Sequence, residues 1–225
     1  MLKTIIKSTA LVGLLMGTVQ AVDIEVRLVN NMATSHFTPL LVAAHPSTAH
    51  IFIPGMPASV ALQAMAEGGD ISGLVTELTS DSANLVENPA GGLLAAGENA
   101  VATLTTDTNN DVLSIVAMIL PSNDGFIGLH NWKIPTQPGV YRVNLDAYDS
   151  GTEANDEIGA NIPQPGPTSA GIGTGGTGVT TLVEGFVHIH RGVLGDTNTT
   201  GGASDFDSTQ HRWLNPVATA IITVR

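Results

Sequence analysis

Residues 145–157, LDAYDSGTEANDE, carry five carboxylates within thirteen residues and have a Ser-Gly-Thr turn at their centre. Carboxylates this close together repel one another, so the segment favours a bound cation. Oxygen ligands on turn-forming backbone suit calcium, which takes roughly six to eight of them. The EF-hand spacing is missing and the flanking sequence is strand-like, so the segment predicts a calcium loop of another kind. The alternative interpretation is a solvated acidic surface loop.

A second acidic turn lies upstream, in residues 118–128, MILPSNDGFIG. The apolar run stops at Pro121, turns through residues 122–125 and resumes with Phe126 and Ile127. Asp124 is therefore predicted at a turn between two strands.

A pair of histidines lies downstream, in residues 185–192, GFVHIHRG. In a strand, His188 and His190 share one face, and two imidazoles at this spacing can bind one transition metal. The alternative is a pair of outward-facing or hydrogen-bonded histidines. A third ligand would come from the remaining histidines, which are His36, His45, His50, His130 and His211.

The rest of the chain predicts an all-β fold, an antiparallel β-sandwich with a few short helices and long Gly/Pro-rich loops. Short runs of Val, Ile and Thr are divided by turn residues, and the chain has 25 Gly and 12 Pro. Such a pattern is typical of sandwiches. The expected strands are 23–30, 40–45, 100–106, 111–120, 127–132, 139–145 and 218–224, and the expected loops include 88–97, 162–178 and 196–207.

Two short helices are predicted between the second and third of these strands. Ser59 can cap a helix whose apolar residues, Leu62, Met65 and Ala66, are spaced to share one face and which Gly68-Gly69 would end. Asp70 is predicted to cap a second helix, 71–78. We interpret Glu67 and Asp70 as a helix end and a helix cap in preference to a catalytic carboxylate pair.

The N-terminal residues 1–21 have the pattern of a secretory signal peptide, with two lysines, a short apolar core and small residues before the expected cleavage site. We therefore expect one domain, 22–225, without a membrane span and located in the periplasm or outside the cell. Without Lys3 and Lys7, 6 basic residues face 20 acidic ones, a formal charge of −14. Nucleic acid is excluded as a partner by this charge. The chain has no Cys, so the fold must depend on its core.

Three linked motifs resemble the spondin N-terminal domain, which occurs in animal F-spondin and mindin and in many bacterial secreted proteins. They are G-x-x-A-S-x-x-L-x-x-x-A-E-x-G-D at 55–70, M-I-x-P-S-x-D-x-F-x-G at 118–128 and L-D-A-x-D-x-G-T-E at 145–153. The resemblance implies that the protein is a bacterial secreted member of this family. It also implies a C2-like sandwich that binds calcium in the loops at one end. Mapped by motif, it implies Asp124 and Asp149 as the first ligand candidates, followed by Asp146 and Glu153.

The function expected from these features is that of a secreted, non-catalytic calcium-binding module that binds or adheres to an extracellular protein, glycan or surface. H-E-x-x-H, G-x-S-x-G and a cysteine nucleophile are all missing from the sequence. The alternative is a zinc or copper protein, or a metalloenzyme, built on His188 and His190. A third reading is a surface component that assembles through exposed sheet edges.

Overall fold

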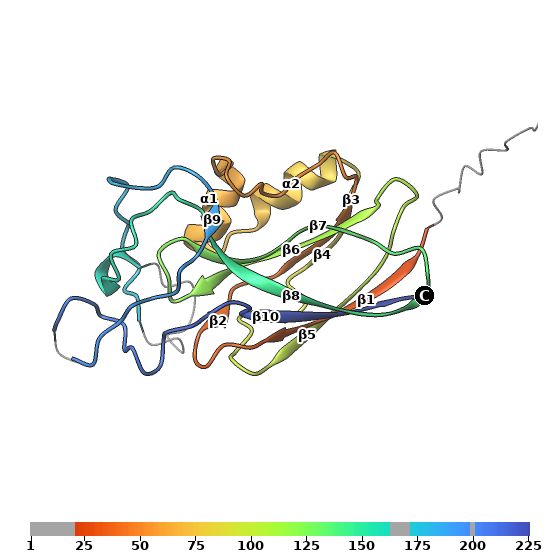
Figure 1. Cartoon of the computed structure of the whole chain (residues 1–225). Coiled ribbons are helices and arrows are strands. Elements are labelled where there is room, and N and C mark those ends of the chain that lie inside the picture. Colours follow the sequence, from red (N-terminus) through yellow and green to blue (C-terminus); the bar gives the residue numbers. More distant parts are fainter. Residues whose placement is uncertain (1–20, 163–171, 199–200) are drawn as a thin grey trace, which may run out of the picture.

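Antiparallel strands form the body of the protein in the computed structural model, which describes residues 21–162, 172–198 and 201–225 (Figure 1). The predicted signal peptide lies outside the described residues except for Ala21, as do residues 163–171 of the predicted loop 162–178. The strands are β1 (Asp23–Asn30), β2 (His36–Phe37), β3 (Leu41–His45), β4 (Asn84–Glu87), β5 (Asn99–Thr105), β6 (Val112–Leu120), β7 (Gly125–Lys133), β8 (Gly139–Asp149), β9 (His188–Ile189) and β10 (Ala218–Val224).

The strands follow one hydrogen-bonded path, β4-β3-β6-β7-β8-β10-β1-β5, with β2 on β6 and β9 on β8. This path folds back on itself as two layers (Figure 1). Its two ends are joined through Asn84 of β4, which accepts a hydrogen bond from the Asp107 backbone N–H at 2.7 Å. The prediction of an all-β antiparallel sandwich is confirmed.

Strand β6 separates two hydrophobic cores, which explains why its sequence is apolar except for Ser114. Ile115, Ala117 and Ile119 face the core between the two layers of the sandwich. Val116 and Met118 face a second core beneath the helices. Because successive side chains of a strand point to opposite faces, all nine residues of β6 are buried.

The helices α1 (Val60–Gly68) and α2 (Ser72–Ser80) cover the outer face of β3 and β6 (Figure 1). The predicted cap of α1 is confirmed, because the Ser59 hydroxyl accepts a hydrogen bond from the Leu62 N–H at 3.1 Å. The predicted start of α2 is wrong by one residue. Its N-cap is Ile71. Asp70, the residue before the N-cap, accepts a hydrogen bond from the Ser72 N–H at 2.9 Å and so stabilises the first turn of α2.

The C-terminal part of β8 corrects the prediction that residues 145–149 belong to an acidic loop. They continue the strand, because Leu145 and Ala147 are buried in the core and residues 146–149 pair with β7. The loop begins only after Asp149. Strand β4 was not predicted, and β7 begins at Gly125, two residues before the predicted start.

The long loops gather at one end of the sandwich, where β7 begins and β8 ends (Figure 1). They include a short 3-10 helix, η1 (Gly159–Asn161). The chain's C-terminus and the start of β1 lie at the opposite end. Within the described part of the chain, neither helix has the length and apolar character needed to cross a membrane.

Candidate metal site at the loop end

Asp124 is held at the start of β7 by a tight turn. The Ser122 hydroxyl donates to the Ile119 carbonyl at 2.6 Å and accepts from the Gly125 N–H at 3.0 Å. One carboxylate oxygen of Asp124, Oδ2, accepts hydrogen bonds from the Ser150 hydroxyl and the Thr152 N–H, both at 2.8 Å. The other, Oδ1, is buried and has no hydrogen-bond partner.

Asp149 ends β8 directly opposite Gly125, the residue after Asp124, and its charge acts on that of Asp124. The Gly151 N–H donates to Oδ1 of Asp149 at 2.8 Å and the Asn155 amide donates to its Oδ2 at 2.7 Å. Burial raises the pKa of Asp149. Burial also raises the pKa of Asp124, and the Asp149 charge adds to that rise. Buried carboxylates whose pKa is raised favour either a proton or a bound cation.

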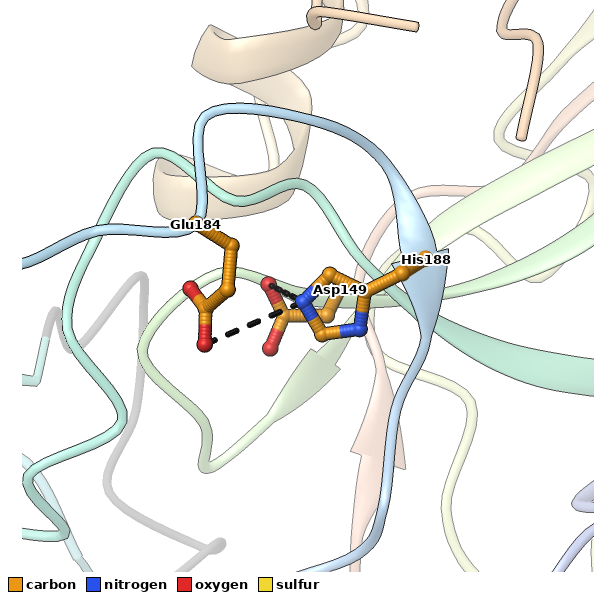
Figure 2. Close-up of side chains that lie close together, drawn as sticks. All are labelled: Asp149, Glu184 and His188. Atoms are coloured by element: carbon orange, nitrogen blue, oxygen red, sulfur yellow. Dashed lines mark ion pairs between the residues drawn. The ribbon is translucent and has the colours of Figure 1, made fainter. Parts of the chain in front are cut away.

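Glu184 and His188 complete a group of three metal-ligand side chains around Asp149. One ligand atom from each residue lies within 4.8 Å of the other two. His188 Nε2 lies 3.5 Å from an oxygen of Asp149 and 3.8 Å from one of Glu184, and Figure 2 shows both carboxylates directed at this nitrogen. Glu184 comes from the loop before β9, and Asp149 comes from the end of β8.

Gly151 allows these two segments to meet. Its φ is +71°, and a Cβ at this position would lie 2.4 Å from the Phe186 carbonyl oxygen. The Gly151 carbonyl also accepts a hydrogen bond from the Gly185 N–H at 2.9 Å. A side chain at 151 would therefore push Glu184 and His188 away from Asp149.

The ring of His188 is oriented as metal-binding histidines usually are. Its Nδ1 lies 3.0 Å from the Ile189 carbonyl oxygen, which can only accept a hydrogen bond, so Nδ1 carries the proton. In the neutral ring the lone pair is then on Nε2, facing Asp149 and Glu184. A backbone carbonyl that fixes the tautomer in this way is a common outer partner of a metal-ligating imidazole.

Four of the buried side-chain atoms that lack a hydrogen-bond partner lie at this end of the described structure. They are Asp124 Oδ1, Glu153 Oε2, Glu184 Oε2 and His188 Nε2. All four are acceptors, given the tautomer of His188. Buried polar atoms are nearly always paired, so acceptors left over together indicate a positively charged ligand.

Of the predicted calcium ligands, Asp149 alone belongs to this group of three among the residues that the structure describes. Asp146 is three residues from Asp149 in the same strand, and its side chain is therefore on the opposite face of β8. Glu153 donates its backbone N–H to Asp124 at 3.1 Å, its carboxylate interacts with the Asp124 charge, and it also lines a cavity with Glu67. Burial, with the charges of Glu67 and Asp124, raises the pKa of Glu153 to about 8.

His190 differs from His188, although both were predicted to bind one metal. It is buried, its ring centroid lies 5.1 Å from that of Trp213, and its Nδ1 accepts a hydrogen bond from the Gly192 N–H at 2.9 Å. The neutral ring then carries its proton on Nε2, and no lone pair remains for a metal. The other histidines do not join the Asp149 group within the residues that the structure describes: His36, His45, His50, His130 and His211.

Acid should weaken the fold through His190. Burial, opposed by the Asp124 charge, lowers the pKa of His190 from 6.5 to about 4. The stabilising contribution is thus complete above pH 6.5 and is lost as the pH falls towards 4, because only the unfolded chain binds the proton. At pH 5 we expect the contribution of His190 to the free energy of unfolding to be about 2 kcal/mol smaller, a change opposed by the buried carboxylates whose pKa is raised.

The measurement is urea unfolding at pH 7.5 and pH 5 of the parent and of His190→Gln, which removes this titration. The variant should lose about 2 kcal/mol less than the parent between the two pH values. An NMR titration of the imidazole provides the direct check. A midpoint near 6.5 for His190 in the native protein would contradict the expectation.

Glu184 is the residue that the sequence interpretation missed. It lies four positions before His188 in a polar loop and belongs to none of the three motifs. The four-residue spacing between Glu184 and His188 does not indicate a metal site in a sequence. The contact of Glu184 with Asp149 depends on the pairing of β9 with β8.

Asp124 and Asp149 both lie within the part of the chain that matches a known protein family. A search of curated proteins finds no match. Residues 30–162 match the family model described as Spondin_N, which is more than half of the chain. Glu184 and His188 lie beyond the matched residues. The match confirms the resemblance carried by the three motifs, and the chain belongs to the spondin N-terminal domain family.

Proposed function

We propose that this protein is a secreted binding module whose loop end is organised by a calcium ion at Asp124 and Asp149. The family supports an extracellular, adhesion-type module. The main support for a bound cation is the set of buried acceptor atoms without hydrogen-bond partners, which includes Asp124 Oδ1 and Glu184 Oε2. Carboxylate oxygens are the ligands that calcium prefers.

The ion would act by ordering the surface that meets the partner. It would neutralise Asp124 and Asp149 and draw Glu184 towards them, which fixes the loop before β9 against the end of β8. Three carboxylates leave positions open in a shell of about six to eight oxygens. An oxygen of an extracellular protein, glycan or surface group would fill one of these positions, so the ion would both shape the site and contact the ligand.

The test is thermal unfolding of the purified protein after chelation and after calcium is restored. Calcium at 100 times its dissociation constant contributes about 2.7 kcal/mol, which for a domain of this size raises Tm by about 5–10 °C. Asp149→Asn should abolish the rise. Asp146→Asn is the matched control, because it removes a carboxylate from the other face of the same strand, and it should keep the rise. An equal rise in Asp149→Asn would refute the site.

A second candidate, zinc or copper binding, is favoured by His188. Its Nε2 lone pair and the carboxylates of Asp149 and Glu184 form a donor set that also suits a transition metal. Two variants separate the candidates. His188→Gln should lose any rise in Tm caused by zinc and keep the rise caused by calcium, whereas Asp149→Asn should lose both. A zinc effect that His188→Gln leaves intact would exclude the transition-metal site.

A further inference from the structure

A cavity of about 570 Å³ lies between the turn that leads into β2 and the loop that leads into β10. The Thr34 hydroxyl donates a hydrogen bond to the Gln210 carbonyl at 2.9 Å and so joins the two segments, and Figure 1 shows the dark blue loop beside β2. Sites for small molecules usually have volumes of about 300–1,000 Å³. The residues that line this cavity include none of the ligands proposed for calcium, so the two sites are separate.

The lining of this cavity combines small apolar side chains with polar ones. The apolar part includes Ala33, Ala95 and Ala96. The polar part includes His36, Asp205 and His211. Neither lysine nor arginine is among the described residues that line it. Such a mixed lining suits a ligand that has both apolar faces and groups that form hydrogen bonds.

The two histidines bring hydrogen-bonding nitrogens to the cavity. His211 Nδ1 accepts a hydrogen bond from the Asp207 N–H at 3.1 Å, and burial lowers the pKa of this ring. At pH 7.5 the neutral ring therefore carries its proton on Nε2 and can donate it. The edge of Phe206 packs against the ring, with centroids 5.6 Å apart. His36 Nδ1 is buried and has no hydrogen-bond partner in the described protein, which indicates that a partner is missing.

The aspartates at the cavity keep their charge without a metal. Thr209 donates to Asp207 Oδ1 from its hydroxyl and from its N–H, both at 2.7 Å, and these hydrogen bonds lower the pKa of Asp207. Asp205 uses one oxygen, Oδ2, to accept from the Gly159 N–H at 2.7 Å. Among the described residues, no group of three metal-ligand atoms gathers at this cavity. The carboxylates are therefore available as hydrogen-bond acceptors.

We propose that this cavity binds a neutral sugar residue. Each hydroxyl group of a sugar both donates and accepts hydrogen bonds. The hydroxyl groups can accept from His211 Nε2 and donate to Asp205, while the C–H face of the ring rests on the three alanines. A metal cation would leave the His211 N–H without an acceptor, and an anion would meet the charges of Asp205 and Asp207. The proposal does not depend on the calcium site.

Saturation-transfer NMR of the purified protein tests this proposal with glucose, galactose, mannose and N-acetylglucosamine, each as the free sugar and as its methyl glycoside. At least one of them should bind saturably. A methyl glycoside that binds more tightly than its free sugar indicates the end of a glycan chain, and the reverse order indicates a soluble sugar.

Two variants locate the binding. His211→Asn keeps an acceptor for the Asp207 N–H and removes the Nε2 donor, and Asp205→Asn replaces one acceptor oxygen with a donor. Both keep the hydrogen bonds of the loop itself, so they should unfold at the Tm of the parent, and each should weaken sugar binding about 3- to 10-fold. His50→Asn changes an exposed histidine outside the cavity and is the matched control, which should bind as the parent does.

Asp149→Asn separates this proposal from the proposed function. Sugar binding should survive in Asp149→Asn and in the presence of a chelator, whether or not calcium binds. Binding that Asp149→Asn abolishes and His211→Asn leaves intact would place the sugar at the calcium site and overturn the proposal. Failure of every sugar to bind, or binding of butylamine in their place, would overturn it as well.

Discussion

Replacing Phe126 with alanine should lower the free energy of unfolding by about 3–5 kcal/mol, the usual cost of removing a large aromatic side chain from a core. Phe126 is fully buried beneath the helices. Its ring meets Phe52 edge to face at 5.2 Å and stacks on Tyr148 at 5.7 Å. The alanine variant loses both contacts and leaves a cavity between the helices and the sheet.

Urea unfolding at a fixed calcium concentration measures this loss. Val140→Ala in β8 is the control, because Val140 is 69% exposed and its truncation should change the free energy of unfolding by less than about 0.5 kcal/mol. A loss below about 1 kcal/mol for Phe126→Ala would show that the second core collapses around the gap and contributes little.

Local patterns predicted those elements whose side chains alternate between core and solvent. In β1, Ile24, Val26 and Leu28 are buried and their neighbours are not, so both the strand and its bounds could be predicted. The cap of α1 is another local feature, since Ser59 and Leu62 are three residues apart. Patterns within a few residues are visible in a sequence because one element alone produces them.

The errors occurred where distant residues decide the local structure. Residues 146–149 are acidic enough to suggest a loop, yet they form a strand because β7 supplies hydrogen bonds and the core accepts Ala147. Strand β4 has only four residues, and it exists because β3 lies beside it. Tertiary pairing overrode local composition in both places.

The residues of the candidate site also fall into those that local sequence suggests and those that only strand pairing brings together. Asp124 and Asp149 are candidates from the sequence alone because each ends a strand or a turn within a recognised motif. Asp146 seemed equivalent to Asp149 in the sequence, but the two-residue period of β8 places it on the other face. Glu184 was invisible because a 35-residue separation from Asp149 carries no information about contact until β9 pairs with β8.

Substituting asparagine for Asp124 should stabilise the protein without calcium and destabilise it with calcium, relative to the parent. In the metal-free protein the Asp124 carboxylate is buried and repelled by the Asp149 charge, and its Oδ1 has no partner. An asparagine can keep its carbonyl oxygen where Oδ2 accepts from Ser150 and Thr152, and can place its amide N–H groups where Oδ1 lies. The variant thereby removes a buried charge and its repulsion by Asp149, a gain of about 1–3 kcal/mol.

Calcium should reverse the order of the two proteins, because only the parent retains the carboxylate that binds the ion. At 100 times the dissociation constant the parent gains about 2.7 kcal/mol, which offsets most or all of the advantage of the variant, and at 1,000 times it gains about 4.1 kcal/mol, which exceeds that advantage. Urea unfolding at pH 7.5, with chelator and then with rising calcium, should therefore show the two free energies crossing. Asp146→Asn should show no crossing. If Asp124→Asn is the less stable protein under both conditions, the Asp124 carboxylate stabilises the metal-free fold. The buried acceptors at the loop end would then be no evidence for a bound cation.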